Sequence, residues 1–256
     1  MIPNIPALFS ILRPTLRSLL LIPLILSAGP LATGVAKAKS TDCVILLHGL
    51  GRTADSMDDM AEALQSAGFI TVNIDYPSRE FPIEKLAVDA ITRGIRQCSS
   101  NSKERIHFVT HSMGGILVRY YLTQSKVPAL GRVVMLSPPN QGSEVVDQLK
   151  DKAFYQWSFG PAGQQLGTNP DGFVFGLGPV TYPVGIITGS DHNLFDSWSS
   201  RQIPGANDGK VSVERAKVEG MSDFLVLPHD HTFIMNQKDV IEQTIHFLRH
   251  GRFQAP

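Results

Sequence analysis

The sequence has little cysteine, no excess charge of either sign and no apolar run long enough to span a bilayer. Its 256 residues include only two cysteines, too few for a disulfide-dense scaffold or a multi-cysteine zinc site. Lys and Arg total 23 and Asp and Glu total 23, so the formal net charge is zero. This balance argues against a basic nucleic-acid-binding surface and against an acidic tail. The hydrophobic content of 43% is sufficient for the core of one ordinary domain.

An apolar run near the N-terminus indicates an export signal. Residues 18–28 are apolar and follow two arginines, but a membrane-spanning helix needs about 20 such residues. The Ala-Lys-Ala sequence at 36–38 has the small-x-small form of a signal peptidase site. We therefore predict a signal peptide over 1–38 and an exported domain, periplasmic or secreted, over 39–256, with an uncleaved anchor as the alternative. Removing the signal would leave 20 basic and 23 acidic residues, a formal charge of −3.

The expected export bears on the two cysteines, because cysteines in an oxidising compartment often pair. Cys43 begins an expected strand, and Cys98 ends an expected helix just before the next strand. Those two ends could be neighbours in a parallel sheet. We predict a disulfide between them, with two buried free thiols as the alternative.

From residue 44 onward, apolar runs and amphipathic stretches alternate. Short apolar runs predict strands, and apolar residues at helical spacing predict helices. The expected strands are 44–47, 70–76, 105–110, 132–136, 183–188 and 223–227, and the expected helices are 56–67, 83–97, 114–124 and 239–249. This order predicts an α/β fold with a mostly parallel sheet and helices on both faces.

The alternation stops between about 140 and 181, where Gly, Pro and aromatic residues are frequent. An irregular stretch of this length inside a domain is usually functional. We expect an insertion that forms a cap over a functional site, with a purely structural excursion as the alternative.

A candidate nucleophile, Ser112, follows the third expected strand. The sequence THSMGG at 110–115 lies between a strand and a helix, the setting of a nucleophile elbow, in which a sharp turn presents the serine hydroxyl. The two glycines allow strand and helix to approach closely. The motif resembles that of the α/β-hydrolase superfamily, in particular its bacterial lipase and esterase branch, similar to class 2 lipases. That family has Gly where this chain has Thr110.

The resemblance implies a catalytic acid and then a histidine after the serine, since that is the chain order in this fold. The histidine belongs in the loop after the last strand, so we expect His231 to be the base, with His229 as the alternate. Asp208 begins an Asp-Gly turn that resembles the acid loop of lipases and is the expected acid. Asp191, which follows the fifth expected strand, is the alternate.

Acyl transfer also requires N–H donors directed at the developing oxyanion. By the same resemblance these are the backbone N–H groups of Met113, directly after the serine, and of Leu50, in the His-Gly loop after the first strand. The sequence has no Gly-rich phosphate loop, and His-Asp-His at 229–231 lacks a third metal ligand. We expect no cofactor and no metal.

The resemblance extends over residues 42–250 and implies a serine hydrolase that cleaves carboxylic esters, an esterase or triacylglycerol-lipase-like enzyme. The same triad also serves amidases, thioesterases and acyltransferases, and a catalytically silent hydrolase-like binding protein is a further alternative. The expected partner is a small-molecule or lipid ester and not a nucleic acid. Contact with a membrane surface, acyl chain length and oligomeric state stay open.

Overall fold

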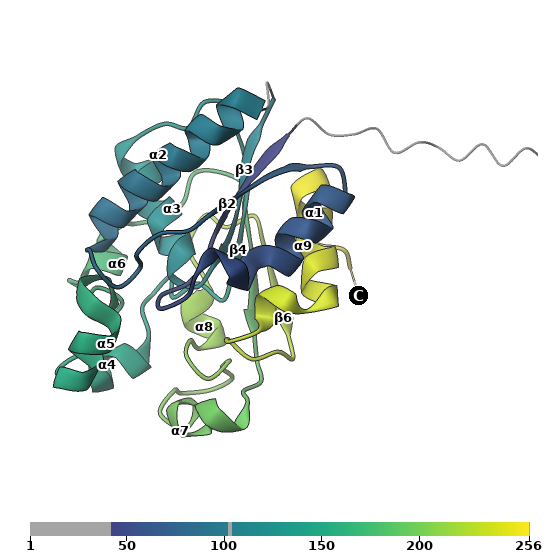
Figure 1. Ribbon diagram of the computed structural model, residues 1–256. Helices are drawn as coiled ribbons and strands as arrows, with labels where there is room; N and C mark the ends of the chain where they lie inside the picture. Colours follow the sequence, from purple (N-terminus) through teal and green to yellow (C-terminus); the bar gives the residue numbers. More distant parts are fainter. Residues whose placement is uncertain (1–41, 102–103, 256) are drawn as a thin grey trace, which may run out of the picture. The chain divides into compact units, whose positions relative to one another are not determined.

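The computed structural model describes residues 42–101 and 104–255, so the expected signal peptide and its cleavage site lie outside the described residues. In the described part, six strands form one sheet in the order β2-β1-β3-β4-β5-β6, and every neighbouring pair is parallel (Figure 1). The strands are β1 (Cys43–Leu47), β2 (Ile70–Ile74), β3 (Ile106–His111), β4 (Leu130–Leu136), β5 (Val184–Gly189) and β6 (Asp223–Leu227).

Helices cover both faces of this sheet (Figure 1). On one face lie α2 (Ile83–Asn101) and α3 (Met113–Gln124), and on the other lie α1 (Asp58–Ser66) and α9 (Lys238–His250). Each helix presents apolar side chains to the strands, which is the arrangement that a parallel sheet requires. The predicted α/β architecture is confirmed.

Strand β1 is buried on both sides, and this explains its uninterrupted apolar sequence, CVILL. In β1, Cys43, Ile45 and Leu47 join the core that includes α2 and α3, whereas Val44 and Leu46 join the core that includes α1 and α9. All five side chains are completely buried. Because side chains alternate along a strand, one short segment contributes to two separate cores.

Several predicted boundaries differ from the structure, and two of the differences have a direct structural reason. The strand expected over 70–76 ends at Ile74, because β2 is an edge strand and its one neighbour, β1, ends at Leu47, which pairs with Ile74. The helix expected over 56–67 begins as a 3₁₀ turn, η1 (Ala54–Met57), before α1. Such turns are frequent at the start of α-helices.

The expected insertion at 140–181 is helical. It contains α4 (Glu144–Leu149), α5 (Ala153–Gln164) and α6 (Phe173–Gly176). α5 is kinked at Gly160, which has φ 58° and precedes Pro161. A Cβ atom at Gly160 would lie 1.7 Å from the backbone oxygen of Arg79, so only glycine allows α5 to approach that loop.

The remaining short elements lie in loops at the sheet's carboxyl edge. η2 (Leu194–Asp196), α7 (Ser197–Ser200) and α8 (Val213–Ala216) separate β5 from β6, and η3 (Ile234–Asn236) follows β6. The carboxyl ends of parallel strands share one edge, which is where ligands bind in open α/β sheets. Among the described residues, no helix combines the length and hydropathy needed to cross a membrane.

The structure joins Cys43 and Cys98 in a disulfide between β1 and α2. Their Cα atoms lie 5.7 Å apart, both side chains are completely buried, and 55 residues separate them in the sequence. Cross-linking two distant points restricts the unfolded chain and thereby raises the free energy of unfolding.

Replacing both cysteines, Cys43→Ala/Cys98→Ala, is expected to lower the free energy of unfolding by about 2–4 kcal/mol. Urea denaturation without reductant measures the difference. As a control, reductant should destabilise the wild type while leaving the double variant unaffected. Equal stability of the two proteins without reductant would contradict the prediction.

Candidate active site

The candidate nucleophile, Ser112, lies at the junction of β3 and α3 in a strained backbone conformation. Its φ of 52° and ψ of −122° are rare for a residue other than glycine. The Ser112 N–H donates to the Leu136 carbonyl at 2.8 Å, which ties the turn to β4. A Cβ atom at Gly114 would lie 2.6 Å from the Leu47 carbonyl oxygen. Glycine at this position therefore lets α3 pack directly against the end of β1.

Ser112, His231 and Asp208 form a continuous hydrogen-bonded chain. The Ser112 Oγ–H donates to His231 Nε2 at 3.0 Å, and His231 Nδ1–H donates to Asp208 Oδ2 at 2.8 Å. The backbone N–H of His231 also donates to the Asp208 carbonyl at 3.0 Å. Asp208 is completely buried, and Ser112 is 9% exposed. The structure thus brings together three side chains from three separate loops.

Asp208 lies in an environment that favours its anionic form. Burial by itself would raise the pKa of this carboxyl, but His231 and hydrogen bonds to the carboxylate lower the pKa below its usual value. The Oδ1 atom accepts from the N–H groups of Val211 at 2.8 Å and Lys210 at 3.0 Å. An anionic Asp208 only accepts hydrogen bonds, so the proton of the His231 ring lies on Nδ1 and the Nε2 lone pair faces Ser112.

The alternate residues have other partners. His229 Nε2–H donates to both carboxylate oxygens of Asp239, each at 2.8 Å. The Asp191 carboxylate is exposed and accepts from the N–H of His192 at 2.8 Å. Neither His229 nor Asp191 lies against Ser112, so the structure brings only His231 and Asp208 into this hydrogen-bonded chain.

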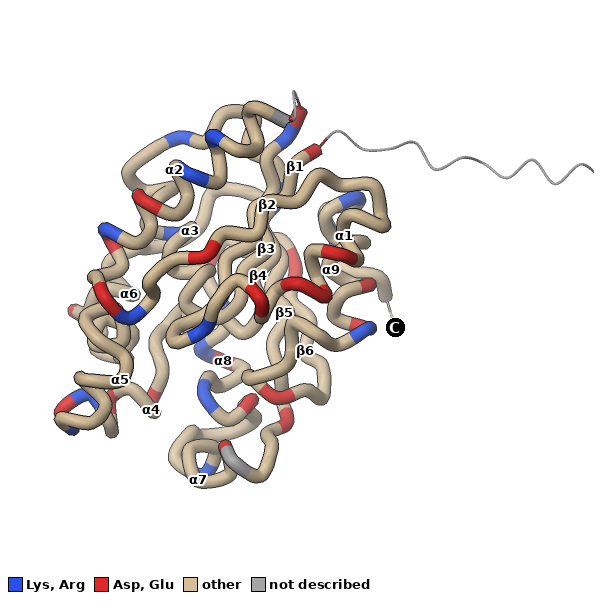
Figure 2. The backbone as a smooth tube through the Cα atoms, viewed as in Figure 1, with Lys and Arg blue, Asp and Glu red and all other residues tan. Residues whose placement is uncertain are grey.

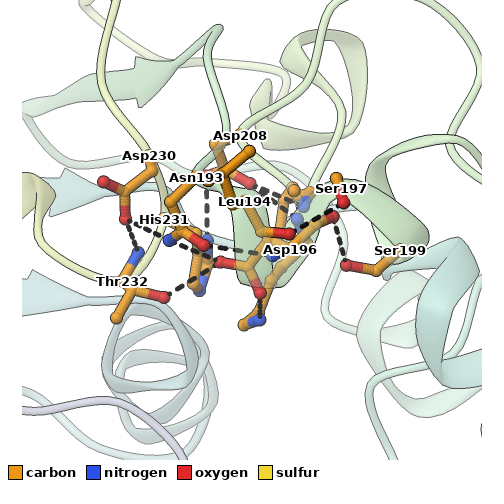
Figure 3. Close-up of polar contacts among 12 residues, drawn as sticks. Asn193, Leu194, Asp196, Ser197, Ser199, Asp208, Asp230, His231 and Thr232 are labelled. Atoms are coloured by element: carbon orange, nitrogen blue, oxygen red, sulfur yellow. Dashed lines mark hydrogen bonds and ion pairs between the residues drawn. The ribbon is translucent and has the colours of Figure 1, made fainter.

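A second carboxylate, Asp196, links the loop of Asp208 to the loop of His231 (Figure 3). Its Oδ2 accepts from Thr232 Oγ1 at 3.2 Å and from Asn193 Nδ2 at 3.0 Å, and its Oδ1 pairs with Lys210 Nζ. Lys210 is two residues after Asp208, and Thr232 directly follows His231. The sequence offers no signal for this role, because the three loops meet only in the folded domain.

His111 forms a hydrogen bond with the loop that carries His231. Its Nε2–H donates to the His231 carbonyl at 2.9 Å, and the two rings lie 5.0 Å apart. Burial, reinforced by the neighbouring His231, holds the pKa of His111 well below its usual value, so the ring is neutral. A Cβ atom at Gly49 would lie 2.8 Å from His111 Nδ1. The first-strand loop therefore approaches the elbow only because it carries glycine there.

Two backbone N–H groups near Ser112 are available as donors. Within the described chain, neither Leu50 nor Met113 donates its N–H to a protein acceptor. The loop of Leu50 is held by His48, whose ring stacks on Tyr76 at 4.0 Å and whose carbonyl accepts from the Tyr76 hydroxyl. Leu50 also lines the same pocket as Ser112.

A pocket of about 300 Å³ opens in front of Ser112 and His231. Apolar side chains of the 140–181 insertion supply much of its wall, namely Val145, Val146, Leu149, Tyr155, Phe159 and Leu166. Phe154 and Trp157, also on α5, are 75% and 84% exposed. The insertion thus contributes both the pocket wall and exposed aromatic side chains.

Three of the buried histidines have a lowered pKa, and we therefore predict that the free energy of unfolding is lower at acidic pH. Burial lowers the pKa of His48, His107 and His111 below the usual value of 6.5. Below about pH 6.5 the unfolded chain binds protons at these positions and the folded chain does not, so the free energy of unfolding falls as pH falls. Each histidine contributes a slope of up to about 1.4 kcal/mol per pH unit.

Urea denaturation between about pH 7.5 and pH 5.5 measures this slope, which should steepen below about pH 6.5. Constant or increasing stability on acidification would contradict the prediction.

Comparisons with known proteins bear on the fold and the family of this chain. A family model described as "Alpha/beta hydrolase family" matches residues 44–230. Comparison with curated proteins gives no match.

Solved structures resemble the chain at low sequence identity. The mature form of a lipase from Bacillus licheniformis is 17% identical with a TM-score of 0.66, covering 80% of this chain and 91% of that chain. Lipase B from Aspergillus fumigatus is 16% identical with a TM-score of 0.61, covering 82% and 52%. A metagenomic carboxyl esterase is 16% identical with a TM-score of 0.61, covering 80% and 68%. At these identities the likeness concerns the fold.

Proposed function

This chain belongs to the alpha/beta hydrolase family, and from that membership we propose that it is a serine hydrolase that cleaves carboxylic esters. The observation that carries the proposal is the hydrogen-bonded chain from Asp208 through His231 to Ser112. A hydroxyl becomes a useful nucleophile when an adjacent base accepts its proton, and the Nε2 atom of His231 lies 3.0 Å from Ser112 Oγ.

In the proposed reaction, His231 Nε2 accepts the Ser112 proton while Oγ attacks the ester carbonyl carbon. The carbonyl electrons move onto oxygen, and the N–H groups of Leu50 and Met113 stabilise the resulting oxyanion. The intermediate collapses, His231 returns the proton to the leaving alcohol, and an acyl-enzyme remains. Water then repeats the sequence with His231 as base, releasing the carboxylic acid and restoring Ser112.

Asp208 acts through His231 in this scheme. It keeps the imidazole in the tautomer whose Nε2 faces Ser112, and its negative charge stabilises the imidazolium that forms during attack. The hydrogen bonds from Lys210 and Val211 favour the anionic form that this role requires.

The pocket supports an ester with an apolar acyl group. Its wall is built largely from aliphatic and aromatic side chains, which suit a hydrocarbon chain better than a peptide. Several similar structures carry the names lipase, carboxyl esterase and phospholipase, in accordance with ester substrates. The buried disulfide supports action in an oxidising compartment, so we extend the proposal to an exported enzyme.

A series of chromogenic esters from acetyl to palmitoyl tests the proposal, with matched anilides as the amide control. We expect ester hydrolysis whose kcat/KM declines once the acyl chain outgrows the pocket, together with labelling by a fluorophosphonate probe. Preference for the anilides would favour an amidase. Absence of both turnover and labelling would favour a catalytically silent binding protein.

A further inference from the structure

A larger cleft opens beside the catalytic pocket, and four arginines line it. The cleft has a volume of about 1030 Å³ and lies between the loop after β1, the loop after β2 and helix α2. Its arginines are Arg52, Arg79, Arg93 and Arg96. Figure 2 shows several Lys and Arg positions along α2, which forms one wall. We name this feature the arginine cleft.

Arg52 connects the arginine cleft to the catalytic pocket, because it lines both. Its guanidinium donates to the backbone carbonyl of Thr232, the residue after His231. Gly51, next to the proposed oxyanion donor Leu50, also lines the cleft and donates its N–H to Ser78 Oγ at 3.0 Å. The arginine cleft therefore adjoins the pocket of Ser112, and Arg52 stands at their boundary.

The three carboxylates that line the cleft form no ion pair with these arginines. Asp89 pairs with Lys85 Nζ at 2.6 Å, and Asp75 accepts from the Ala54 N–H at 3.1 Å. The third carboxylate, Glu80, is exposed. In the part of the chain that the structure describes, no carboxylate lies within 4.0 Å of any of the four guanidinium groups.

The arginines also keep most of their hydrogen-bonding capacity. Arg93 donates to the Asp75 backbone carbonyl at 2.6 Å, whereas Arg79 and Arg96 donate to no described residue. Arg79, Arg93 and Arg96 are all exposed. The cleft has four guanidinium groups against three carboxylates, and none of the four is held in an ion pair by a described residue. Guanidinium groups in this state can offer their planar donor sets to the oxygens of a carboxylate or phosphate.

We propose that the arginine cleft binds an anionic group on the alcohol portion of the ester substrate, while the acyl chain occupies the apolar pocket. The inference rests on the proposed ester hydrolysis and specifies its substrate class: esters whose alcohol carries a carboxylate or a phosphate. The largely aliphatic and aromatic wall of the pocket in front of Ser112 suits the acyl chain, and the neighbouring cleft supplies guanidinium groups for the anion.

The test compares butyrate esters of three alcohols: phenol, 4-hydroxybenzoate and a phenol that bears a phosphate group. The variant is Arg93→Gln/Arg96→Gln, because both arginines lie on α2 and neither lines the pocket of Ser112. Lys126→Gln/Arg252→Gln removes the same charge from exposed positions outside both cavities. Arg96→Gln alone provides a second variant, and thermal melting verifies folding of each protein.

For at least one anionic ester, we expect the arginine variant to lower kcat/KM by about three- to tenfold. Hydrolysis of the neutral ester should stay within about twofold of wild type, and the control variant should match wild type on every ester. Raising NaCl from about 0.02 M to about 0.5 M should reduce the wild-type preference for the anionic ester. A loss confined to the phosphate or the carboxylate ester supports the proposal and identifies the anion.

Equal losses on neutral and anionic esters, or no loss on either anionic ester, would overturn the assignment of the cleft while leaving ester hydrolysis intact. Failure of the wild type to hydrolyse even the neutral ester would overturn the proposed function and, with it, the substrate class.

Discussion

Ser112→Ala is expected to lower kcat for ester hydrolysis by about four to six orders of magnitude. The variant lacks the oxygen that forms the acyl-enzyme, so that His231 and the Leu50 and Met113 N–H groups can only assist attack by water. The effect should fall on kcat far more than on KM, because the pocket wall is unchanged. Single-turnover hydrolysis of a chromogenic butyrate measures it, and the fluorophosphonate label should disappear.

The matched control is Ser143→Ala. Ser143 also lines the pocket, but its hydroxyl donates to the Lys210 carbonyl at 2.6 Å and contacts neither His231 nor Asp208. We expect this variant to stay within about tenfold of wild type and to retain the label. Comparable activity of Ser112→Ala and wild type would exclude the serine mechanism.

His231→Ala should reduce kcat by a similar factor, because without a base the Ser112 hydroxyl keeps its proton. The substitution also leaves the buried Asp208 carboxylate without its histidine partner, which should destabilise the folded protein at neutral pH. Thermal melting and single-turnover kinetics separate these two effects, since a folded but inactive variant shows a normal cooperative transition.

His229→Ala is the matched control, because it removes a histidine from the same loop at a distance of two residues. His229 bonds to Asp239 at the surface, so its loss should cost less than about 1 kcal/mol of stability and little activity. A large loss of kcat in His229→Ala, with His231→Ala active, would transfer the role of base to His229.

Much of the fold could be predicted because its signals are local. A strand buried on both faces is typically apolar along its length, and β1 (CVILL) and most of β5 (VGIITG) show this pattern. The elbow is also local: the turn at Ser112 depends on the small residue Gly114, which stands two positions away. The end of β2 could not be predicted from its own sequence. Ile74 is its last residue because the neighbouring strand β1 ends at Leu47, which pairs with Ile74.

The candidate catalytic residues could be predicted because the fold restricts their order along the chain. The contacts between loops could not be predicted from the sequence. Sequence position favoured His231 and Asp208 but did not exclude His229 and Asp191. Either histidine and either aspartate gives the chain order serine, acid, histidine. Asp196 shows the limit most clearly. Its contacts with Lys210 and Thr232 join three loops, and no spacing in the sequence indicates that they meet.

By itself the sequence determined the α/β class, the position of the elbow and the set of candidate acids and bases, because these depend on periodicity and on neighbouring residues. Only the tertiary structure decided which histidine reaches Ser112, which aspartate reaches that histidine, and which four arginines share a cleft beside them. The physical reason is that a hydrogen bond forms only when donor and acceptor lie about 3 Å apart in space, whatever their separation along the chain. Ser112 and His231 are 119 residues apart in the chain, and folding alone brings them to 3.0 Å.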